Sequence, residues 1–219
     1  MSLDAVLKVG GSLDRHAGLP ALCRGIGQLA EHYRLLIVPG GGIFADQVRE
    51  MYRRYSLDEA TAHRMALLAM DQYGYLLNRL IADSILINDL PSVGQTAVTG
   101  RAMILLPSAP VNSDDTLPHS WEVTSDSIAA WITHQAHCRR LVLLKDVDGL
   151  LTRDNPPGLI AELTVRQLSG HVGGVDKYLS YILAVSNLET WVINGLKPER
   201  LAELLDTSNT IGTRIAPGF

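Results

Sequence analysis

The chain has 219 residues, of which 47% are hydrophobic and 19% charged, with a formal net charge of −4. This composition supports one substantial core, and the acidic balance argues against a nucleic-acid partner, because phosphate backbones are bound by basic surfaces. No apolar run approaches the roughly 20 residues of a membrane helix and no signal segment is visible, so we expect a cytoplasmic protein with no membrane partner.

Strands and helices alternate along the chain. Residues 5–9 predict a buried strand, residues 17–32 a helix, the segment before Pro39 a second strand, and residues 43–55 and 57–82 two further helices. A strand at 103–106, a polar loop through Pro118, the helical segment SDSIAAWITHQAH and the apolar strand RRLVLLKDVDG follow. After a Gly/Pro turn come a short strand, the strand TWVIN, the helix KPERLAELLD and the terminal segment GTRIAP. This alternation predicts an α/β sandwich around a mainly parallel sheet.

Glycine-rich or acidic loops lie at the ends of several predicted strands, where ligands bind in open sheets of this kind. The segments are KVGGS (8–12), PGGG (39–42), KDVDG (145–149) and GGVDK (173–177). Glycines let backbone N–H groups approach an anion, and a following helix adds the positive end of its dipole. The loops therefore predict a site for phosphate-sized groups.

Lysine is scarce in this sequence. Only four of the 19 basic residues are lysines, and three of them, Lys8, Lys145 and Lys177, lie in these loops, whereas the fourth is Lys197. A compact ammonium on a flexible stem suits contact with a phosphate oxygen. A general preference for arginine can account for the overall bias, but not for the positions of the remaining lysines.

Two familiar nucleotide-binding signatures are absent or weak. The P-loop pattern G-x-x-x-x-G-K-[ST] does not occur. The segment GGGIFA loosely fits a dinucleotide-binding turn, but it follows the second strand, and no acidic residue closes the next strand to bind a ribose. A nicotinamide enzyme is therefore disfavoured.

The ordered motifs KVGGS, VPGGG, TSDSIAA, LLKDVDGLLTRD, GGVDK and GTRI resemble the amino acid kinase family from residue 5 to about 216. The resemblance implies a three-layer αβα sandwich formed by a single domain, 1–219. It places the acceptor in an N-terminal lobe, about 1–124, and ATP in a C-terminal lobe, about 125–219. Homo-oligomers, dimers or larger, are also implied.

The resemblance further implies roles for individual residues. Lys8 and Lys177 correspond to lysines that converge on the transferred phosphoryl group, and Asp146 to the carboxylate that orients them. On the nucleotide side, the corresponding residues are Gly10, Gly11, Ser12, Lys145, Asp148, Gly149, Thr152 and Gly174. On the acceptor side, they are Gly40, Gly41, Gly42, His119, Trp121, Ser125 and Asp126. The backbone N–H donors among the glycines would be Gly10, Gly11, Gly41 and Gly42.

These assignments explain why a buried strand contains Lys8. A buried lysine tends to lose its proton, so a phosphate or the Asp146 carboxylate must keep it ionised. Mg²⁺ would bridge nucleotide oxygens while keeping its waters, so dedicated metal ligands are not expected. No strong catalytic base is visible, which fits an acceptor that is already anionic, a phosphate or a carboxylate.

The acceptor is less clearly indicated. The segments LPHSWEVTSDSIAAW, ILLPS and WVINGLKPERL are similar to small archaeal family members that phosphorylate an aminomethyl-furanyl methyl phosphate in methanofuran-type cofactor synthesis. In that case Trp121 would shape an aromatic-sized pocket and His119 would contact the acceptor phosphate, unless both merely pack a loop. Kinases of uridylate, isopentenyl phosphate, acetylglutamate or aspartate remain alternatives, as does a non-catalytic storage-type binder of nucleotide or oxyanion.

Several residues have a structural alternative. Asp126 could only complement a helix dipole, and Lys145 could form an outward salt bridge. His134, His137 and Cys138 have a spacing that could ligate a metal, although packing and helix-end charge are favoured because no fourth ligand is evident. Arg64 or Arg79 could bind the acceptor anion.

Overall fold

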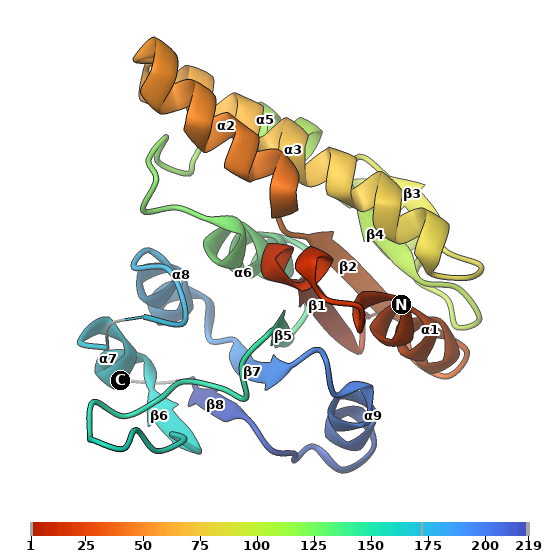
Figure 1. Cartoon of the computed structure of the whole chain (residues 1–219). Coiled ribbons are helices and arrows are strands. Elements are labelled where there is room, and N and C mark those ends of the chain that lie inside the picture. Colours follow the sequence, from red (N-terminus) through yellow and green to blue (C-terminus); the bar gives the residue numbers. More distant parts are fainter. Residues whose placement is uncertain (1, 172, 218–219) are drawn as a thin grey trace.

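The computed structural model describes residues 2–171 and 173–217 (Figure 1). The strands are β1 (Ala5–Val9), β2 (Leu35–Pro39), β3 (Ile85–Ile87), β4 (Met103–Leu105), β5 (Arg140–Lys145), β6 (Glu162–Thr164), β7 (Glu189–Asn194) and β8 (Thr213–Ala216). The helices are η1 (Gly11–Arg15, a 3₁₀ helix), α1 (Leu19–Ala30), α2 (Gly42–Tyr55), α3 (Glu59–Leu80), α4 (Leu90–Thr96), α5 (Ser108–Asp114), α6 (Ser125–Gln135), α7 (Val165–Ser169), α8 (Leu179–Ser186) and α9 (Pro198–Thr207).

The strands form one eight-stranded sheet in the order β3-β4-β2-β1-β5-β7-β8-β6. The pairings from β3 to β7 are parallel, β8 runs antiparallel to β7, and β6 pairs parallel with β8. The prediction of a mainly parallel sheet is therefore confirmed. β1 lies between β2 and β5, so the loops that follow these three strands meet at one edge of the sheet.

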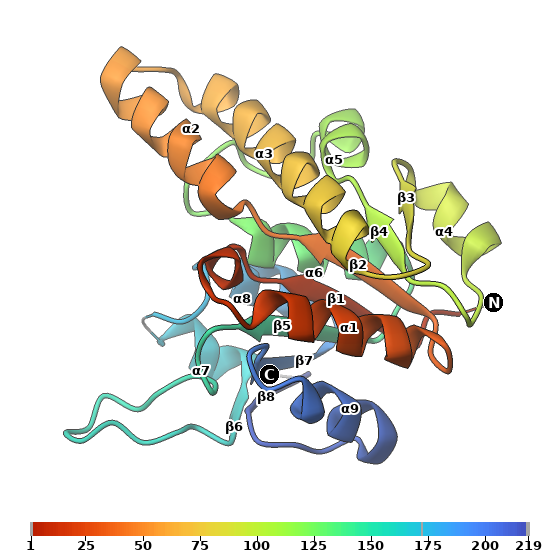
Figure 2. The ribbon, with the colours of Figure 1, turned by 45° about the vertical axis from the view of Figure 1, so that its right-hand side comes forward.

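Side chains alternate between the two faces of β1, and each face has its own core. Ala5, Leu7 and Val9 pack with α1 and α9, whereas Val6 packs with α6 and α8. Figures 1 and 2 show α1 and α9 on one side of the sheet and α6 and α8 on the other. The three-layer αβα sandwich is confirmed, and the alternation directs Lys8 toward α6.

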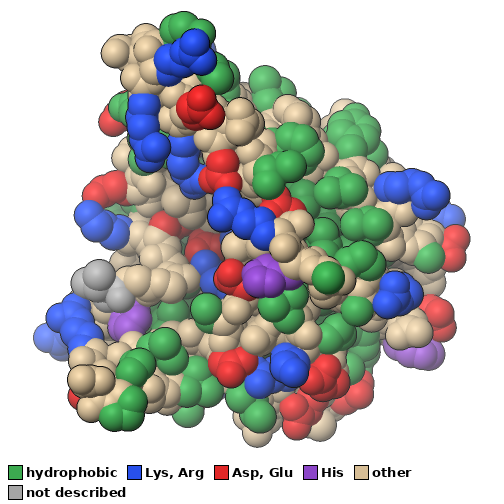
Figure 3. Space-filling view, viewed as in Figure 1, with side chains coloured by type: hydrophobic (Ala, Val, Ile, Leu, Met, Phe, Trp, Pro, Cys, Tyr) green, Lys and Arg blue, Asp and Glu red, His purple; other side chains and the backbone are tan. Residues whose placement is uncertain are grey.

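Helices α2 and α3 pack side by side and extend beyond the sheet (Figures 1 and 2). Their apolar contacts include Ala45 and Val48 of α2 and Ala69 of α3. In Figure 3, Lys and Arg side chains gather at the upper left of the molecule, where α2 lies. The N-terminus of α2 follows the glycines after β2, so this helix begins at the edge of the sheet where the loops meet.

The segment 85–118 is more structured than the sequence analysis predicts. Besides the expected strand β4, it contains β3, α4 and α5. Both helices have only 7 residues, too few to give a clear helical periodicity. Helix α4 begins at a cap, because the Asp89 carboxylate accepts a hydrogen bond from the Ser92 N–H at 2.8 Å. Both helices are also held by packing, since Val93 of α4 and Val111 of α5 are buried.

Within residues 2–171 and 173–217, no helix is both long and apolar enough to cross a membrane.

Candidate active site

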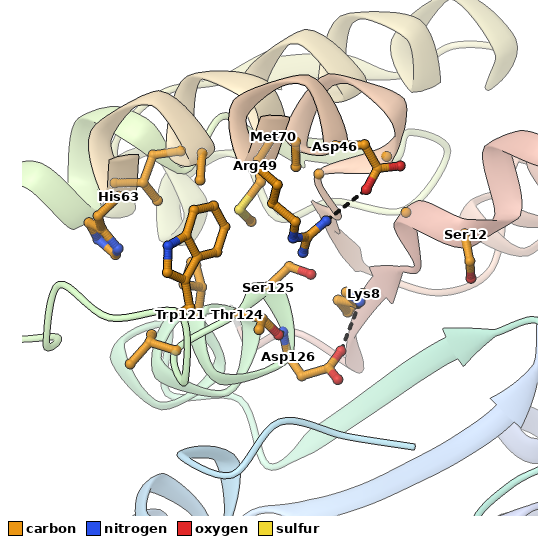
Figure 4. A pocket seen from close by; sticks show the side chains of 18 of the residues that line it. Lys8, Ser12, Asp46, Arg49, His63, Met70, Trp121, Thr124, Ser125 and Asp126 are labelled. Carbon is orange, nitrogen blue, oxygen red and sulfur yellow. Dashed lines mark hydrogen bonds and ion pairs between the residues drawn. The ribbon is translucent and has the colours of Figure 1, made fainter. Parts of the chain in front are cut away.

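A cavity of about 290 Å³ opens where the loops after β1 and β2 meet α2, α3 and the beginning of α6 (Figure 4). Glycines of both loops line it together with an apolar wall and a set of charged side chains. The polar lining residues are Lys8, Ser12, Arg15, Asp46, Arg49, His63, Thr124, Ser125, Asp126 and Lys145. The apolar wall includes Ala66, Leu67, Met70, Trp121 and Val123.

At the inner end of the cavity, two lysines share one carboxylate. Lys8 Nζ lies 2.8 Å from Asp126 Oδ1, and Lys145 Nζ donates a hydrogen bond to Asp126 Oδ2 at 2.6 Å. Lys8 and Asp126 are only 4% and 3% exposed, and the Lys145 side chain is 16% exposed. Figure 4 shows Lys8 at the end of β1 facing Asp126 at the beginning of α6.

The positions of Lys8, Lys145 and Asp126 in the backbone explain why these side chains are in contact. Lys8 is in register with Leu143 of β5, so Lys145, two residues further along, lies on the same face of the sheet. Asp126 is the second residue of α6, whose N-cap Thr124 accepts a hydrogen bond from the Asp126 N–H. Because α6 covers that face, its first turn places a carboxylate against both ammonium groups.

Burial and ion pairing act in opposite directions in this cluster. Burial disfavours the charged form of Asp126, but Lys8 and Lys145 outweigh burial and hold the pKa of this carboxyl well below its usual range. Burial lowers the pKa of Lys8, and the neighbouring Lys145 lowers it further, against the attraction of Asp126 and, more weakly, of Asp176. Both lysines also line the cavity, where an anionic ligand can reach them.

The glycine loops approach each other so closely that side chains are excluded. A Cβ on Gly11 would lie 2.4 Å from the Gly42 nitrogen, and Gly42 has a φ of +54°. Of the glycines expected to donate N–H groups, Gly11, Gly41 and Gly42 line the cavity. The expectation that Gly10 donates its N–H to a ligand is wrong, because this N–H is already donated to the Leu144 carbonyl at 2.8 Å. The Gly40 N–H is likewise donated to Val9, at 2.8 Å.

On the opposite wall, α2 contributes charges and an aromatic contact. Arg49 Nη1 lies 2.8 Å from Asp46 Oδ1, and Asp46 also pairs with Arg15 of η1. The Arg49 guanidinium lies 5.5 Å from the ring centre of Trp121, and the Tyr52 ring packs edge-on against that indole at 5.4 Å. Trp121 is thereby held against the cavity (Figure 4).

A pair of histidines closes the far end. The His63 ring stacks on the His119 ring with a centroid distance of 4.7 Å, and His119 Nε2 lies 2.8 Å from Asp115 Oδ1. His63 lines the cavity, but His119, the predicted phosphate contact, is not among the lining residues. Burial, and secondarily His119, lower the pKa of His63, so the ring is neutral near pH 7.

Two of the predicted catalytic residues lie elsewhere. Lys177 is not brought to Lys8, because its Nζ lies 2.8 Å from Glu122 Oε1 at the surface, with the lysine side chain 83% exposed. Asp146 is not the counter-charge of the lysines. It pairs with His16, whose Nε2 lies 3.6 Å from Asp146 Oδ2. The carboxylate that joins the lysines is Asp126, so that assignment is corrected.

The remaining predicted nucleotide-side residues lie outside this cavity. Asp148 Oδ1 accepts hydrogen bonds from Asn194 Nδ2 at 2.8 Å and Arg200 Nη1 at 2.7 Å. Thr152 Oγ1 accepts one from the Gly158 N–H at 2.8 Å. Gly149 and Gly174 have φ angles of +155° and +81°. They form a region separate from the cavity, near β5, β7 and the 149–158 loop.

Sequence reasoning missed Arg15, Asp46, Arg49 and His63. A usable signal existed for two of them, because Asp46 and Arg49 stand three residues apart just after a glycine loop and therefore share a face of α2. Arg64 and Arg79, the arginines considered for the acceptor anion, are exposed on α3 and do not line the cavity.

Cys138 is buried, and its Sγ lies 3.5 Å from the Arg140 carbonyl oxygen, consistent with packing. Within the described ranges 2–171 and 173–217, no group of three or more His, Cys, Asp or Glu side chains could hold a metal ion.

The two cysteines give a direct test of packing. Both Cys23 and Cys138 are buried, and burial raises the pKa of Cys23 to about 12, so neither thiol should form a reactive thiolate at pH 7.5. We expect no reaction of the native protein with Ellman's reagent within an hour and release of two equivalents in guanidinium chloride. Rapid reaction of the native protein would contradict the packing of α1 and of the α6–β5 connection.

The chain is similar in sequence to kinases over nearly its whole length. The amino acid kinase family pattern matches residues 5–194. The chain is 28% identical over 212 residues to a [5-(aminomethyl)furan-3-yl]methyl phosphate kinase of Methanocaldococcus jannaschii, covering 96% of each chain. It is 22% identical over 233 residues to a uridylate kinase of Methanothermobacter thermautotrophicus, covering 97% of this chain and 98% of that protein.

Solved structures show the same fold. The uridylate kinase of Archaeoglobus fulgidus superposes with a TM-score of 0.76 at 19% identity, covering 97% of this chain and 99% of that one. The UMP kinase of Ureaplasma parvum gives a TM-score of 0.76 at 17% identity, with 99% of each chain covered. Because the family pattern extends over most of the sequence and the fold agrees, the chain belongs to the amino acid kinase family.

Proposed function

We propose that the protein transfers the γ-phosphoryl group of ATP to an anionic oxygen of a small molecule. The observation that supports this most is the buried cluster in which Lys8 and Lys145 share the Asp126 carboxylate at the inner end of a cavity lined by two glycine loops. Phosphoryl transfer needs positioning and positive charge around the migrating group, and the cluster offers both. Membership in a family of kinases agrees with this chemistry.

The step would need no general base. An ionised acceptor oxygen attacks the γ-phosphorus, the bond to the β–γ bridging oxygen breaks, and its electron pair leaves with ADP. Lys8 would bind the oxygens of the migrating group, while Asp126 holds its ammonium in place. Most of the residues that line the cavity come from the segment before residue 125, which we propose as the acceptor lobe (about 1–124), and the proposed ATP lobe (about 125–219) contributes Ser125, Asp126, Ile128 and Lys145. Mg²⁺ would enter with the nucleotide and neutralise phosphate charge.

Asp148, Gly149, Thr152 and Gly174 remain proposed contacts of the nucleotide, and Lys177 remains a proposed contact of the transferred group. These assignments rest on the family motifs in the sequence.

For the acceptor we propose an aminomethyl-furanyl methyl phosphate. The kinase of that name from Methanocaldococcus jannaschii is similar over nearly the whole chain. The cavity also fits a small aromatic phosphate, because Trp121, Leu67 and Met70 form an apolar wall while Arg15 and Arg49 lie beside it. The product would be the corresponding diphosphate.

Uridylate is the second candidate, supported by the similar uridylate kinase. Purified protein should be given ATP and Mg²⁺ with the furan phosphate, UMP, isopentenyl phosphate, acetylglutamate or aspartate, and ADP release measured. We expect the highest kcat/KM with the furan phosphate. A higher value with UMP would overturn the acceptor. ATP bound tightly without turnover on any acceptor would overturn the kinase and favour a storage-type binder.

Replacing Trp121 with alanine tests the acceptor wall. We expect the KM for the furan phosphate to rise about tenfold, equivalent to about 1.4 kcal/mol of lost binding, while the KM for ATP stays within twofold. Tyr75, which is 59% exposed on α3 outside the cavity, provides the control Tyr75→Ala, expected to leave both constants unchanged. An unchanged acceptor KM in Trp121→Ala would remove Trp121 from the acceptor site.

A further inference from the structure

We infer that Lys145 is a second catalytic ammonium, which binds the migrating phosphoryl group together with Lys8. This inference rests on the proposed kinase function and adds a residue to its reacting centre. It also assigns to Lys145 a contact that the sequence motifs suggested for Lys177.

The first support is geometric. Lys8 and Lys145 contact the two different oxygens of Asp126, at 2.8 and 2.6 Å. The oxygens of one carboxylate are roughly 2.2 Å apart, so the two ammonium nitrogens are at most about 8 Å apart. A phosphoryl group has a similar distance between its own oxygens, and ammonium contacts to phosphate are about 2.8 Å. One phosphoryl group can therefore contact both ammoniums at once.

The second support is access. Both lysines line the cavity, and Lys145 is mostly buried, with 16% of its side chain exposed. Lys145 is the last residue of β5, so its main chain is fixed by pairing with Asn194 of β7. A charge held on a strand end needs little reorganisation when the transition state forms.

The third support is the position of the competing lysine. Lys177 lies outside the cavity lining and pairs with Glu122, and both side chains are mostly exposed. To reach Asp126, it would have to leave this partner and move with its loop. Lys145 requires no such movement.

The fourth support is charge. Asp126 is the carboxylate in direct contact with both ammoniums, and Asp176 attracts Lys8 from a greater distance. The two ammoniums repel each other, and this repulsion is relieved when an anion arrives between them.

The test replaces Lys145 with methionine, which keeps the length of the side chain and removes the charge. We expect kcat to fall about 100-fold or more, with the KM for ATP changed less than threefold, because the lost contact is stronger in the transition state than in the bound ground state. The matched control is Arg139→Met, which removes an exposed cation just before the opposite end of β5. It should leave kcat unchanged.

Chemical rescue guards against a folding defect. Lys145→Cys treated with bromoethylamine gains an ammonium at nearly the original position, and the native Cys23 and Cys138 are buried and should not react. We expect alkylation to raise the kcat of Lys145→Cys at least tenfold. A parallel Lys177→Met variant compares the two lysines in the same assay.

The outcomes separate this inference from the proposed function. If the wild type is active and Lys145→Met keeps kcat within threefold, Lys145 is not catalytic, and the proposed function stands. Loss of activity that alkylation does not restore also overturns the catalytic role. A wild type inactive on every acceptor overturns the proposed function itself, and this inference with it.

Discussion

The Lys8→Met variant is expected to lose about 1,000-fold in kcat. The variant removes the most deeply buried cation of the cluster, only 4% exposed, while Lys145 still neutralises Asp126. The positive charge that would meet the transferred phosphoryl group therefore falls, and a single preorganised electrostatic contact contributes about 100- to 1,000-fold. Initial rates of ADP release at saturating ATP and acceptor measure the effect.

The control for this experiment is Lys197→Met, because Lys197 is exposed before α9 and does not line the cavity. It should retain kcat within twofold. Folding of Lys8→Met is checked by near-UV circular dichroism, since methionine fills the volume and leaves Asp126 paired. A folded Lys8→Met variant with wild-type kcat would contradict the assignment of the reacting centre.

The Asp126→Asn variant is expected to lose about 3–5 kcal/mol of unfolding free energy at pH 7, because Lys8 and Lys145 are left without their counter-charge. Urea unfolding followed by tryptophan fluorescence measures the loss. Asp154 is exposed near the turn after β5, and Asp154→Asn should change stability by less than about 0.5 kcal/mol. A loss below about 1 kcal/mol in Asp126→Asn would mean that the carboxylate is not the partner of buried charges.

The pH dependence has a defined sign in two windows. The folded-state pKa of Asp126 lies below its unfolded value of about 3.9, so its stabilisation is complete above that pH and is lost as the pH falls below it. The folded-state pKa of Lys8 is lowered by burial, so between this pKa and the unfolded value of about 10.4 the unfolded state binds more protons and stability rises with pH. Because Asp126→Asn removes the carboxylate that opposes this lowering, the stability of the variant relative to wild type should rise as the pH increases above 7. A stability gap that widens with pH would contradict the pairing of Lys8 with Asp126.

Much of the fold was predictable, and the reason is visible in β1 and β5. Both are continuous apolar segments, each followed by a loop with glycine, and such segments form buried parallel strands. Of the residues that the family motifs singled out, Lys8, Gly11, Gly41 and Gly42 line the cavity. The short helices α4 and α5 were missed because packing and a local cap, not periodicity, stabilise them.

The choice between Asp126 and Asp146 could not be made from local pattern. Asp146 directly follows Lys145 in the chain, whereas Asp126 precedes it by 19 residues and reaches it only when α6 packs on the sheet. Side chains alternate between the two faces of a strand, so Lys145 lies on the same face of the sheet as Leu143. It therefore shares a face with Lys8 only because Lys8 is in register with Leu143. That register is a tertiary property, which the sequence of neither strand specifies alone.

The cavity wall from α2 was missed for a similar reason. Asp46 and Arg49 follow the glycine loop on one helical face, but the contact of Arg49 with Trp121 depends on the path of the loop before α6. The Lys177–Glu122 pair joins the same loop to the GGVDK segment, so the motif alone could not show where that lysine would lie.

Binding of one anion between Lys8 and Lys145 can be measured directly, because the chain has only four lysines. Protein labelled with ¹³Cε,¹⁵Nζ-lysine should give four side-chain signals, from Lys8, Lys145, Lys177 and Lys197, which the Lys→Met variants assign. On titration with the furan phosphate and a non-hydrolysable ATP analogue, we expect the Lys8 and Lys145 signals to shift together along one binding curve while the Lys197 signal stays fixed. Saturation of both ligands with the Lys8 and Lys145 signals unmoved would contradict this expectation.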